Sequence, residues 1–193
     1  MLEPLVKLCK ELFPAIADET HEAAEKAIRE IHETSKNYSL ISRPLENVQL
    51  AQGDIFSGIP FCYINQNGGI SKQELEGMLL TNTCDNQRRD NLLFSPLRRI
   101  SDLFPDDSTM AKRLKENGYY YLFYLNEQGI SDKFVDFNQV MSINRERFVK
   151  RLEDSTVSRL CSLSQIGYYV FITKLTIFFM RYEDKDVNGN RFI

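Results

Sequence analysis

The segment from Gly53 to Arg99 constrains the fold more than any other part of the chain. It contains three runs rich in strand-forming residues, 54–64, 77–83 and 91–97, each bounded by turn-forming residues. The first run ends at Asn65-Gln66-Asn67-Gly68-Gly69, which favours a tight reversal because glycine and asparagine tolerate positive φ. The segment therefore predicts a small antiparallel β core that begins with a hairpin.

Further elements follow this core. The residues of 119–125 and 134–137 favour two more strands, the first of them aromatic. A short helix is expected over 109–116, with Gly118 as its C-cap. The last third of the chain reads as helical, with Asn144 as the N-cap of a helix over 145–153 and Ser164 as the N-cap of a longer helix to about Glu183.

The N-terminal part predicts two amphipathic helices, over 2–13 and from Asp18 onwards. Residues 1–35 hold eight acidic and four basic side chains, so this arm is acidic. It either packs on the core with a solvated acidic face or binds a partner. We predict three parts: a helical arm and connector over 1–46, a β domain over 47–143, and helices over 144–193 that pack on it.

The final helix is apolar nearly all round, which requires cover on several sides. It either lies between the β domain and the N-terminal helices or forms a protein interface. The interface would use Tyr169, Ile172, Phe178 and Phe179.

Charge and composition exclude several classes of function. The 193 residues have a formal net charge of −3, which gives no overall attraction to nucleic acid or to anionic membranes. The histidines, His21 and His32, are too far apart along a helix to bind one metal ion, so we expect neither a metal site nor a Ser-His-Asp triad. We expect no cofactor. The widely spaced cysteines and the lack of an export signal or membrane span predict a soluble cytoplasmic protein with reduced thiols.

Two arginine pairs are the best local candidate for a site that binds phosphate or nucleic acid. Arg88-Arg89 and Arg98-Arg99 flank the third strand, near the turn that contains Thr81 and Asn82. The alternative is a surface whose charges pair with one another, since residues 85–116 hold seven bases and six acids. Cys84 with Asp85 is a weaker candidate for a nucleophile and its partner.

The order of elements over 53–99 resembles the MazF/PemK-type toxin family. The matching features are the Gly53-Asp54 opening, the long hairpin, the strand that ends at Met78-Leu79-Leu80-Thr81-Asn82, and the strand containing Phe94-Ser95-Pro96-Leu97. The resemblance implies an α+β fold with a small antiparallel SH3-like barrel of about five to seven strands, flanked by N- and C-terminal helices.

The resemblance also implies what this chain lacks. The family cleaves single-stranded RNA with an arginine at the start of its second strand and a threonine or serine at the end of its third. Glu76-Gly77 and Leu97-Arg98 occupy these places here. A carboxylate repels a phosphate where the family has a cation, so we predict no catalytic residue.

The sequence therefore favours a non-catalytic accessory module of a bacterial toxin–antitoxin-like or antiphage defence system. It would act through a protein partner or as a homo-oligomer, with no membrane contact. Two alternatives stay open. One is an endoribonuclease or RNA-binding toxin that uses the arginines; the other is a structural subunit that oligomerises through its last helix.

Overall fold

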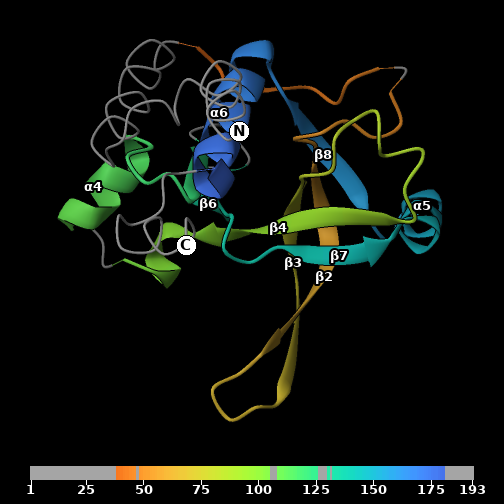
Figure 1. The fold of residues 1–193 in the computed structure, drawn as a ribbon, viewed down its shortest axis with the longest axis horizontal. Helices are drawn as coiled ribbons and strands as arrows, with labels where there is room; N and C mark the ends of the chain where they lie inside the picture. The colour runs from red at the N-terminus through yellow and green to blue at the C-terminus, as the bar shows by residue number, and fades with distance from the viewer. Residues whose placement is uncertain (1–37, 47, 105–107, 126–129, 131, 181–193) are drawn as a thin grey trace, which may run out of the picture.

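A computed structural model describes residues 38–46, 48–104, 108–125, 130 and 132–180. Figure 1 shows a sheet whose strands cross at steep angles, with a long two-stranded arm projecting from the body. The predicted N-terminal helices, both histidines and Cys9 lie outside the described residues.

The strands form one eight-stranded sheet in the order β1-β8-β2-β3-β4-β6-β5, with β7 also paired to β4. Every pairing is antiparallel, as the sequence predicts. Because β1 and β5 end the path without pairing to each other, the predicted closed SH3-like barrel is not found within the described residues. The strands are β1 (Ile41–Ser42), β2 (Ile55–Ile64), β3 (Ile70–Leu79), β4 (Asn91–Arg99), β5 (Leu122–Leu125), β6 (Lys133–Asp136), β7 (Met141–Asn144) and β8 (Ser158–Leu163).

Six of these strands, β2 to β7, lie within the predicted β region, which confirms five or more strands there. β1 and β7 lie in segments where no strand is predicted, and two further strands differ from expectation. β3 begins at Ile70, seven residues before the predicted 77–83, and β8 falls in the segment expected to be helical. β8 completes the sheet by pairing with both β1 and β2, so 158–163 belongs to the β domain.

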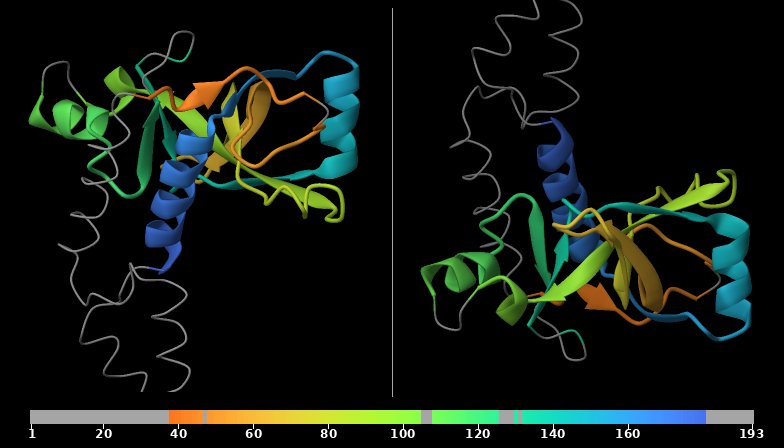
Figure 2. Two further views of the ribbon diagram at one scale, coloured as in Figure 1. Left: turned by 90° about the horizontal axis from the view of Figure 1, so that it is seen from above. Right: turned by 90° about the horizontal axis from the view of Figure 1, so that it is seen from below.

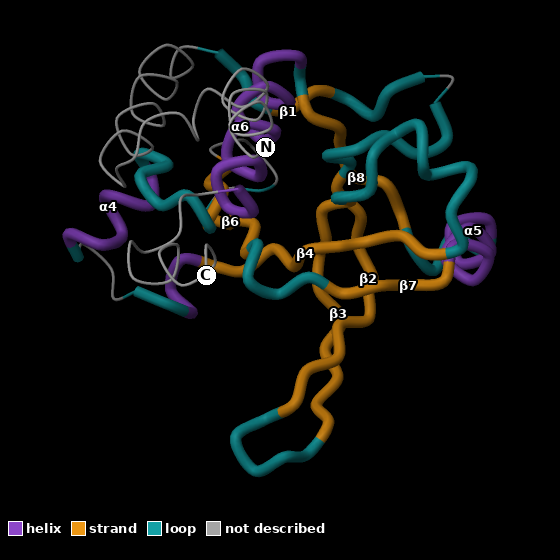
Figure 3. The backbone as a smooth tube through the Cα atoms, in the orientation of Figure 1, coloured by secondary structure: helices purple, strands orange, loops and turns teal. Residues whose placement is uncertain are grey.

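The described helices lie closer to their predicted bounds than the strands do (Figure 3). They are α4 (Thr109–Lys115), α5 (Arg145–Glu153) and α6 (Gln165–Met180), with a 3-10 turn over Ile100–Asp102. Asn144 and Ser164 are N-caps as predicted, accepting hydrogen bonds from the backbone N–H groups of Arg147 and Gly167. Gly118 is not the residue that ends α4 in the left-handed conformation: Asn117 takes that position, with φ 54°.

The middle of the sheet is buried on both faces. Ile55 and Met78 belong to a core cluster with Phe171 of α6, whereas their neighbours Phe56 and Leu79 belong to one with Phe148 of α5. Successive side chains of a strand point to opposite faces, so α6 and α5 cover opposite faces of β2 and β3 (Figure 2). A third cluster joins α4 to β5 and β6.

A β-bulge separates the buried half of β2 from its projecting half. The β2–β3 register shifts between Phe56 and Ile59, and Gly58 within this step has φ 72°. A Cβ at Gly58 would lie 2.6 Å from the backbone oxygen of Thr156, so only glycine fits. Beyond the bulge, β2 and β3 continue as the projecting hairpin, residues 60–74, hereafter the arm (Figures 1 and 3).

Candidate functional site

A cleft opens at the base of the arm, where β3 and β4 separate. Their ladder consists of Gly77–Pro96, Met78–Ser95 and Leu79–Phe94, and β4 then runs on towards the 3-10 turn while β3 runs into the arm. The cleft between them has a volume of about 570 Å³. Its lining consists of Gly58, Gln73, Glu74, Leu75, Glu76, Leu97, Arg99, Asp102 and Lys133. We call it the arm cleft.

Each carboxylate that lines the arm cleft has a basic group close to it, either in the lining or beside it. Lys133 Nζ donates to both carboxylate oxygens of Glu76 at 2.8 Å. Arg151 Nη2 lies 3.3 Å from Glu74 Oε1, and Arg98 Nε lies 3.9 Å from Asp102 Oδ2. Because each cleft carboxylate has a basic neighbour, the cleft offers little surplus positive charge to a polyanion.

The hydrogen-bond pattern fixes which residues of β3 face the cleft. Leu80 N–H donates to Leu93 O at 2.8 Å, and Asn65 N–H donates to Gly69 O at 2.8 Å. In an antiparallel ladder alternate residues face opposite edges. The backbone groups of Ile70, Lys72, Glu74 and Glu76 therefore face away from β2. β4 still lies beside Glu76 and has diverged from the other three.

This outer edge of β3 is unpaired. Within the described residues, neither a ladder pair nor another hydrogen bond engages the backbone N–H and C=O groups that face outward at 70, 72 and 74. At Glu76 the edge is still covered by β4, because the Gly77–Pro96 pair is flanked by backbone bonding between Glu76 and Leu97. The other edge of the arm differs, because Pro60 has no N–H to donate there. The arm thus presents one edge that can add a strand.

Both family positions singled out in the sequence lie on the arm cleft. Glu76 and Leu97 both line it, side by side at the end of the β3–β4 ladder, next to the Gly77–Pro96 pair. The sequence argument did not anticipate Lys133, which is 57 positions from Glu76 and neutralises its carboxylate. Only the β4–β6 pairing of Arg99 with Lys133 brings this lysine to the cleft, so no local signal could have found it.

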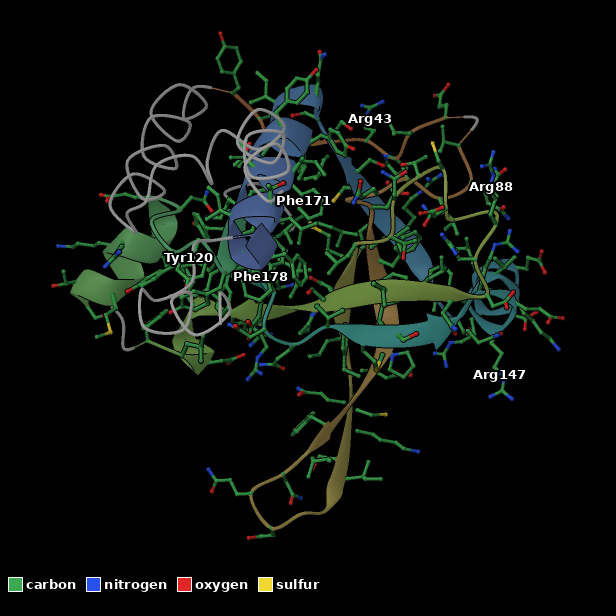
Figure 4. The ribbon with its side chains drawn as sticks, in the orientation of Figure 1. Arg43, Arg88, Tyr120, Arg147, Phe171 and Phe178 are labelled. Carbon is green, nitrogen blue, oxygen red and sulfur yellow. The ribbon has the colours of Figure 1, made fainter. Side chains whose placement is uncertain are left out.

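The structure does not bring the four predicted arginines together. Arg88 and Arg89 lie in the loop before β4, and Arg98 and Arg99 end that strand. Seven residues of β4, from Asn91 to Leu97, lie between the pairs and separate them by about 23 Å at about 3.3 Å per residue. Arg99 lines the arm cleft. Arg88 projects at the opposite end of β4, on the side where α5 carries Arg147 (Figure 4).

Thr81 and Asn82 hold the turn after β3. Thr81 Oγ1 accepts a hydrogen bond from Leu93 N–H at 2.7 Å, and Asn82 Oδ1 accepts one from Cys84 N–H at 2.9 Å. Arg89 Nε lies 3.6 Å from Asp85 Oδ1 at the exposed end of this loop. These hydrogen bonds and this ion pair stabilise the conformation of the loop. Cys84 lies in the same loop and is exposed.

The predicted interface residues of α6 divide into two kinds. Tyr169 and Phe179 are 60% and 65% exposed. Ile172 and Phe178 instead pack on the core, with the Phe178 ring 6.0 Å from that of Phe137 (Figure 4). Two of the four residues are therefore exposed on α6, and the other two are partly buried; the interface stays a prediction.

Two buried polar groups lie outside the cleft. The Asp54 carboxylate binds Ala51 N–H, Ser162 Oγ and Arg159, and so fixes the loop before β2 against β8. Lys174 of α6, 1% exposed, donates to Asn117 O and Tyr119 O at 2.7 Å. Burial lowers the pKa of Lys174 well below its ordinary value of 10.5. Neither group lines the arm cleft, so we assign both to the fold.

Among the described residues, no three His, Cys, Asp or Glu side chains gather closely enough to hold a metal ion. None of the helices in that part of the chain is long and apolar enough to span a bilayer.

The fold and the cleft define an α+β protein built on an open antiparallel sheet with a splayed pair of strands. No protein-family model matches the chain, and no curated protein does. The solved structures include a match to the MazE–MazF complex (form II) of Deinococcus radiodurans, with 11% identity over 67% of this chain and 95% of that chain, and a TM-score of 0.39. A match at this level does not assign the chain to a family.

Proposed function

We propose that this chain is a non-catalytic protein-binding module that accepts an extended segment of a protein along the outer edge of β3. The observation that supports this is the row of unpaired backbone groups at Ile70, Lys72 and Glu74, which leads into the arm cleft. Adding a strand to an exposed sheet edge is a common mode of peptide recognition, because the backbone hydrogen bonds give affinity and the side chains give specificity.

The charges of the arm cleft favour a protein ligand over RNA. RNA cleavage would need a cation for the phosphate and a hydroxyl to position it. At this place the chain has Glu76, already bound by Lys133, and the apolar Leu97. A peptide needs neither group, since its amides bond to the strand edge.

The cellular setting is a separate part of the proposal. Membership of a cytoplasmic toxin–antitoxin-like or antiphage defence system rests on the sequence resemblance to MazF/PemK toxins. The test below does not depend on it.

Hydrogen exchange with a protein partner tests the proposal. A tagged chain is used to isolate partners from its native host, and exchange is then measured with and without each retained protein. We expect slowed exchange at the amides of Lys72 and Glu74, which face outward, and little change at Ser71 and Gln73, which already face β2. Lys72→Pro should abolish binding, since it removes an outward N–H and leaves the arm's own hydrogen bonds intact.

Retention of RNA in place of protein would favour the alternative function. Arg88 and Arg89 are then the first residues to replace with glutamate, because they are exposed at the end of the molecule away from the cleft. A loss of RNA binding in that variant, with unchanged exchange along β3, would contradict the proposed function.

A further inference from the structure

We infer that the segment accepted by the outer edge of β3 is the C-terminal segment of a partner protein, which pairs parallel to β3 and places its free α-carboxylate beside Arg99. The inference rests on the proposed function, because it uses the same edge. It goes further by naming the end of the partner that binds, the direction of its chain and the residue that recognises it.

The open part of the β3 edge is short and is blocked at one end. Its unpaired outward residues, Ile70, Lys72 and Glu74, span about 13 Å at about 3.3 Å per residue. At Glu76 the edge is bonded to β4, so an added strand cannot continue past this point. A strand that enters from the tip of the arm, residues 65–69, must therefore turn away or end at the arm cleft.

Arg99 lies where such a strand would end. If the β3–β4 ladder continued, Arg99 would be the partner of Glu74, but the two strands have separated there and the arm cleft lies between them. The cleft volume of about 570 Å³ is within the range of about 300–1,000 Å³ that is usual for ligand pockets. Both residues line the cleft, so the end of an added strand would lie beside the Arg99 side chain.

Arg99 is the cation of the cleft lining whose charge is not neutralised by a neighbour. Lys133, Arg151 and Arg98 each lie beside one of the three carboxylates that line the cleft. Asp102 accepts a hydrogen bond from the Arg99 backbone N–H at 3.3 Å, but the Arg99 guanidinium has neither a hydrogen bond nor an ion pair among the described residues. One unpaired guanidinium suits a single carboxylate, which it can bind through two parallel N–H groups.

This unpaired charge determines which end of the partner binds. β3 runs from the tip of the arm towards the cleft, so a parallel strand brings its C-terminus to Arg99 and an antiparallel strand brings its N-terminus (Figure 1). A guanidinium attracts an α-carboxylate and repels an α-amino group. Capture of a terminal carboxylate is a recurring mode of peptide recognition, and here it is combined with addition of a strand.

Peptide libraries test the chemistry of the bound end. Octapeptides randomised at every position are presented to the full chain in two forms, one attached through the N-terminus with a free α-carboxylate and one attached through the C-terminus. The strongest binder of the first form is then made as a free acid and as a C-terminal amide, and fluorescence anisotropy gives both dissociation constants. We expect the amide to bind about tenfold or more weakly, because it lacks the charge-assisted hydrogen bonds to Arg99.

The Arg99→Gln variant links that preference to one residue. Arg99 is exposed, so the variant should keep the fold. It should bind the free acid about tenfold or more weakly than the wild type does, and it should bind the acid and the amide equally. Arg88→Gln is the matched control, since Arg88 is also exposed but projects at the opposite end of β4 (Figure 4). This control should keep both the affinity and the preference for the acid.

The outcomes separate this inference from the proposed function. Equal binding of acid and amide by the wild type, an Arg99→Gln variant that still prefers the acid, or a first library without any binder overturns the inference. If an internal segment of a host protein then slows exchange at the amides of Lys72 and Glu74, the proposed function stands. If the free acid depends on Arg99 but leaves exchange at these amides unchanged, the peptide does not lie on β3, which contradicts the inference and the proposed function alike.

Discussion

The contact between Lys133 and Glu76 changes the charge that the arm cleft presents to a ligand. Taken alone, Glu76 places a negative charge where the resembling family has a cation. In the structure Lys133 donates to both of its oxygens, and Glu74 has Arg151 beside it in the same way. The cleft is therefore a set of paired charges on a strand edge, which suits a peptide backbone better than a phosphate.

Lys174 is the other residue whose surroundings determine its chemistry. Its amine is enclosed by Asn117 O and Tyr119 O at 2.7 Å and by Asn117 Oδ1 at 3.3 Å. A neutral amine has two N–H groups, which is enough for the two short contacts. This agrees with the direction in which burial moves its pKa.

We predict a pH dependence of stability that comes from Lys174. In the unfolded chain the Lys174 amine has its ordinary pKa of about 10.5, and in the folded chain burial lowers that pKa. Between the two pKa values the unfolded chain binds more protons than the folded chain. The free energy of unfolding therefore rises as pH increases towards 10. Urea unfolding of the wild type and of Lys174→Met should show a difference that changes with pH in this direction. The measurements should stop below pH 10, where tyrosine ionisation adds a pH dependence of its own. Burial raises the pKa of Tyr121 and Tyr124 in the folded chain from the ordinary value of 10.0. A difference that is constant with pH would contradict the prediction.

At the scale of elements, β2 depends on its bulge. The Gly58 bulge directs the outer half of the strand away from the body and lets Arg151 of α5 bind the Gly58 carbonyl at 3.2 Å. The arm and its cleft both follow from this one irregularity.

Gly58→Ala should lower the free energy of unfolding by about 1–3 kcal/mol, since it adds a side chain at positive φ and a clash with the Thr156 carbonyl. Gly68→Ala is the matched control. It has a similar φ, 77°, but nothing lies within 4 Å of the added carbon, so only the backbone strain remains. Urea unfolding of both variants measures the difference. Equal losses would mean that the bulge relaxes to admit a side chain.

At the scale of the molecule, the two main core clusters are joined by shared strands. Ile55 and Met78 pack under α6, and Phe56 and Leu79 under α5, so neither cluster can be lost without disturbing β2 and β3. Phe148 is the central residue on the α5 side, with its ring 5.1 Å from Phe56 and 5.0 Å from Phe94.

The described part of the chain should therefore unfold as one unit. Phe148→Ala and Phe171→Ala should each lower the free energy of unfolding by about 3–5 kcal/mol. Far-ultraviolet circular dichroism and tyrosine fluorescence should give coincident transitions in both variants, although the substitutions lie on opposite faces. Separate transitions in either variant would show that the two clusters fold independently.

Local chemistry in the sequence determined the hairpin turn, the strands β2 and β4, and the three described helices α4, α5 and α6. α5 has the predicted bounds because Asn144 supplies its cap, and the Asn65–Gly69 turn fixes where β2 reverses. Turns and caps depend on neighbouring residues, so they can be read along the chain.

Tertiary structure alone decided the rest. The first half of β3, Ser71 to Glu76, is polar and becomes a strand only because β2 pairs with it, and β8 joins the sheet by pairing with β2 about 100 positions earlier. The open sheet, the separation of the arginine pairs by β4, and the meeting of Lys133 with Glu76 arise in the same way. Strand pairing is a contact between distant segments, and the local sequence of one segment does not specify its partner.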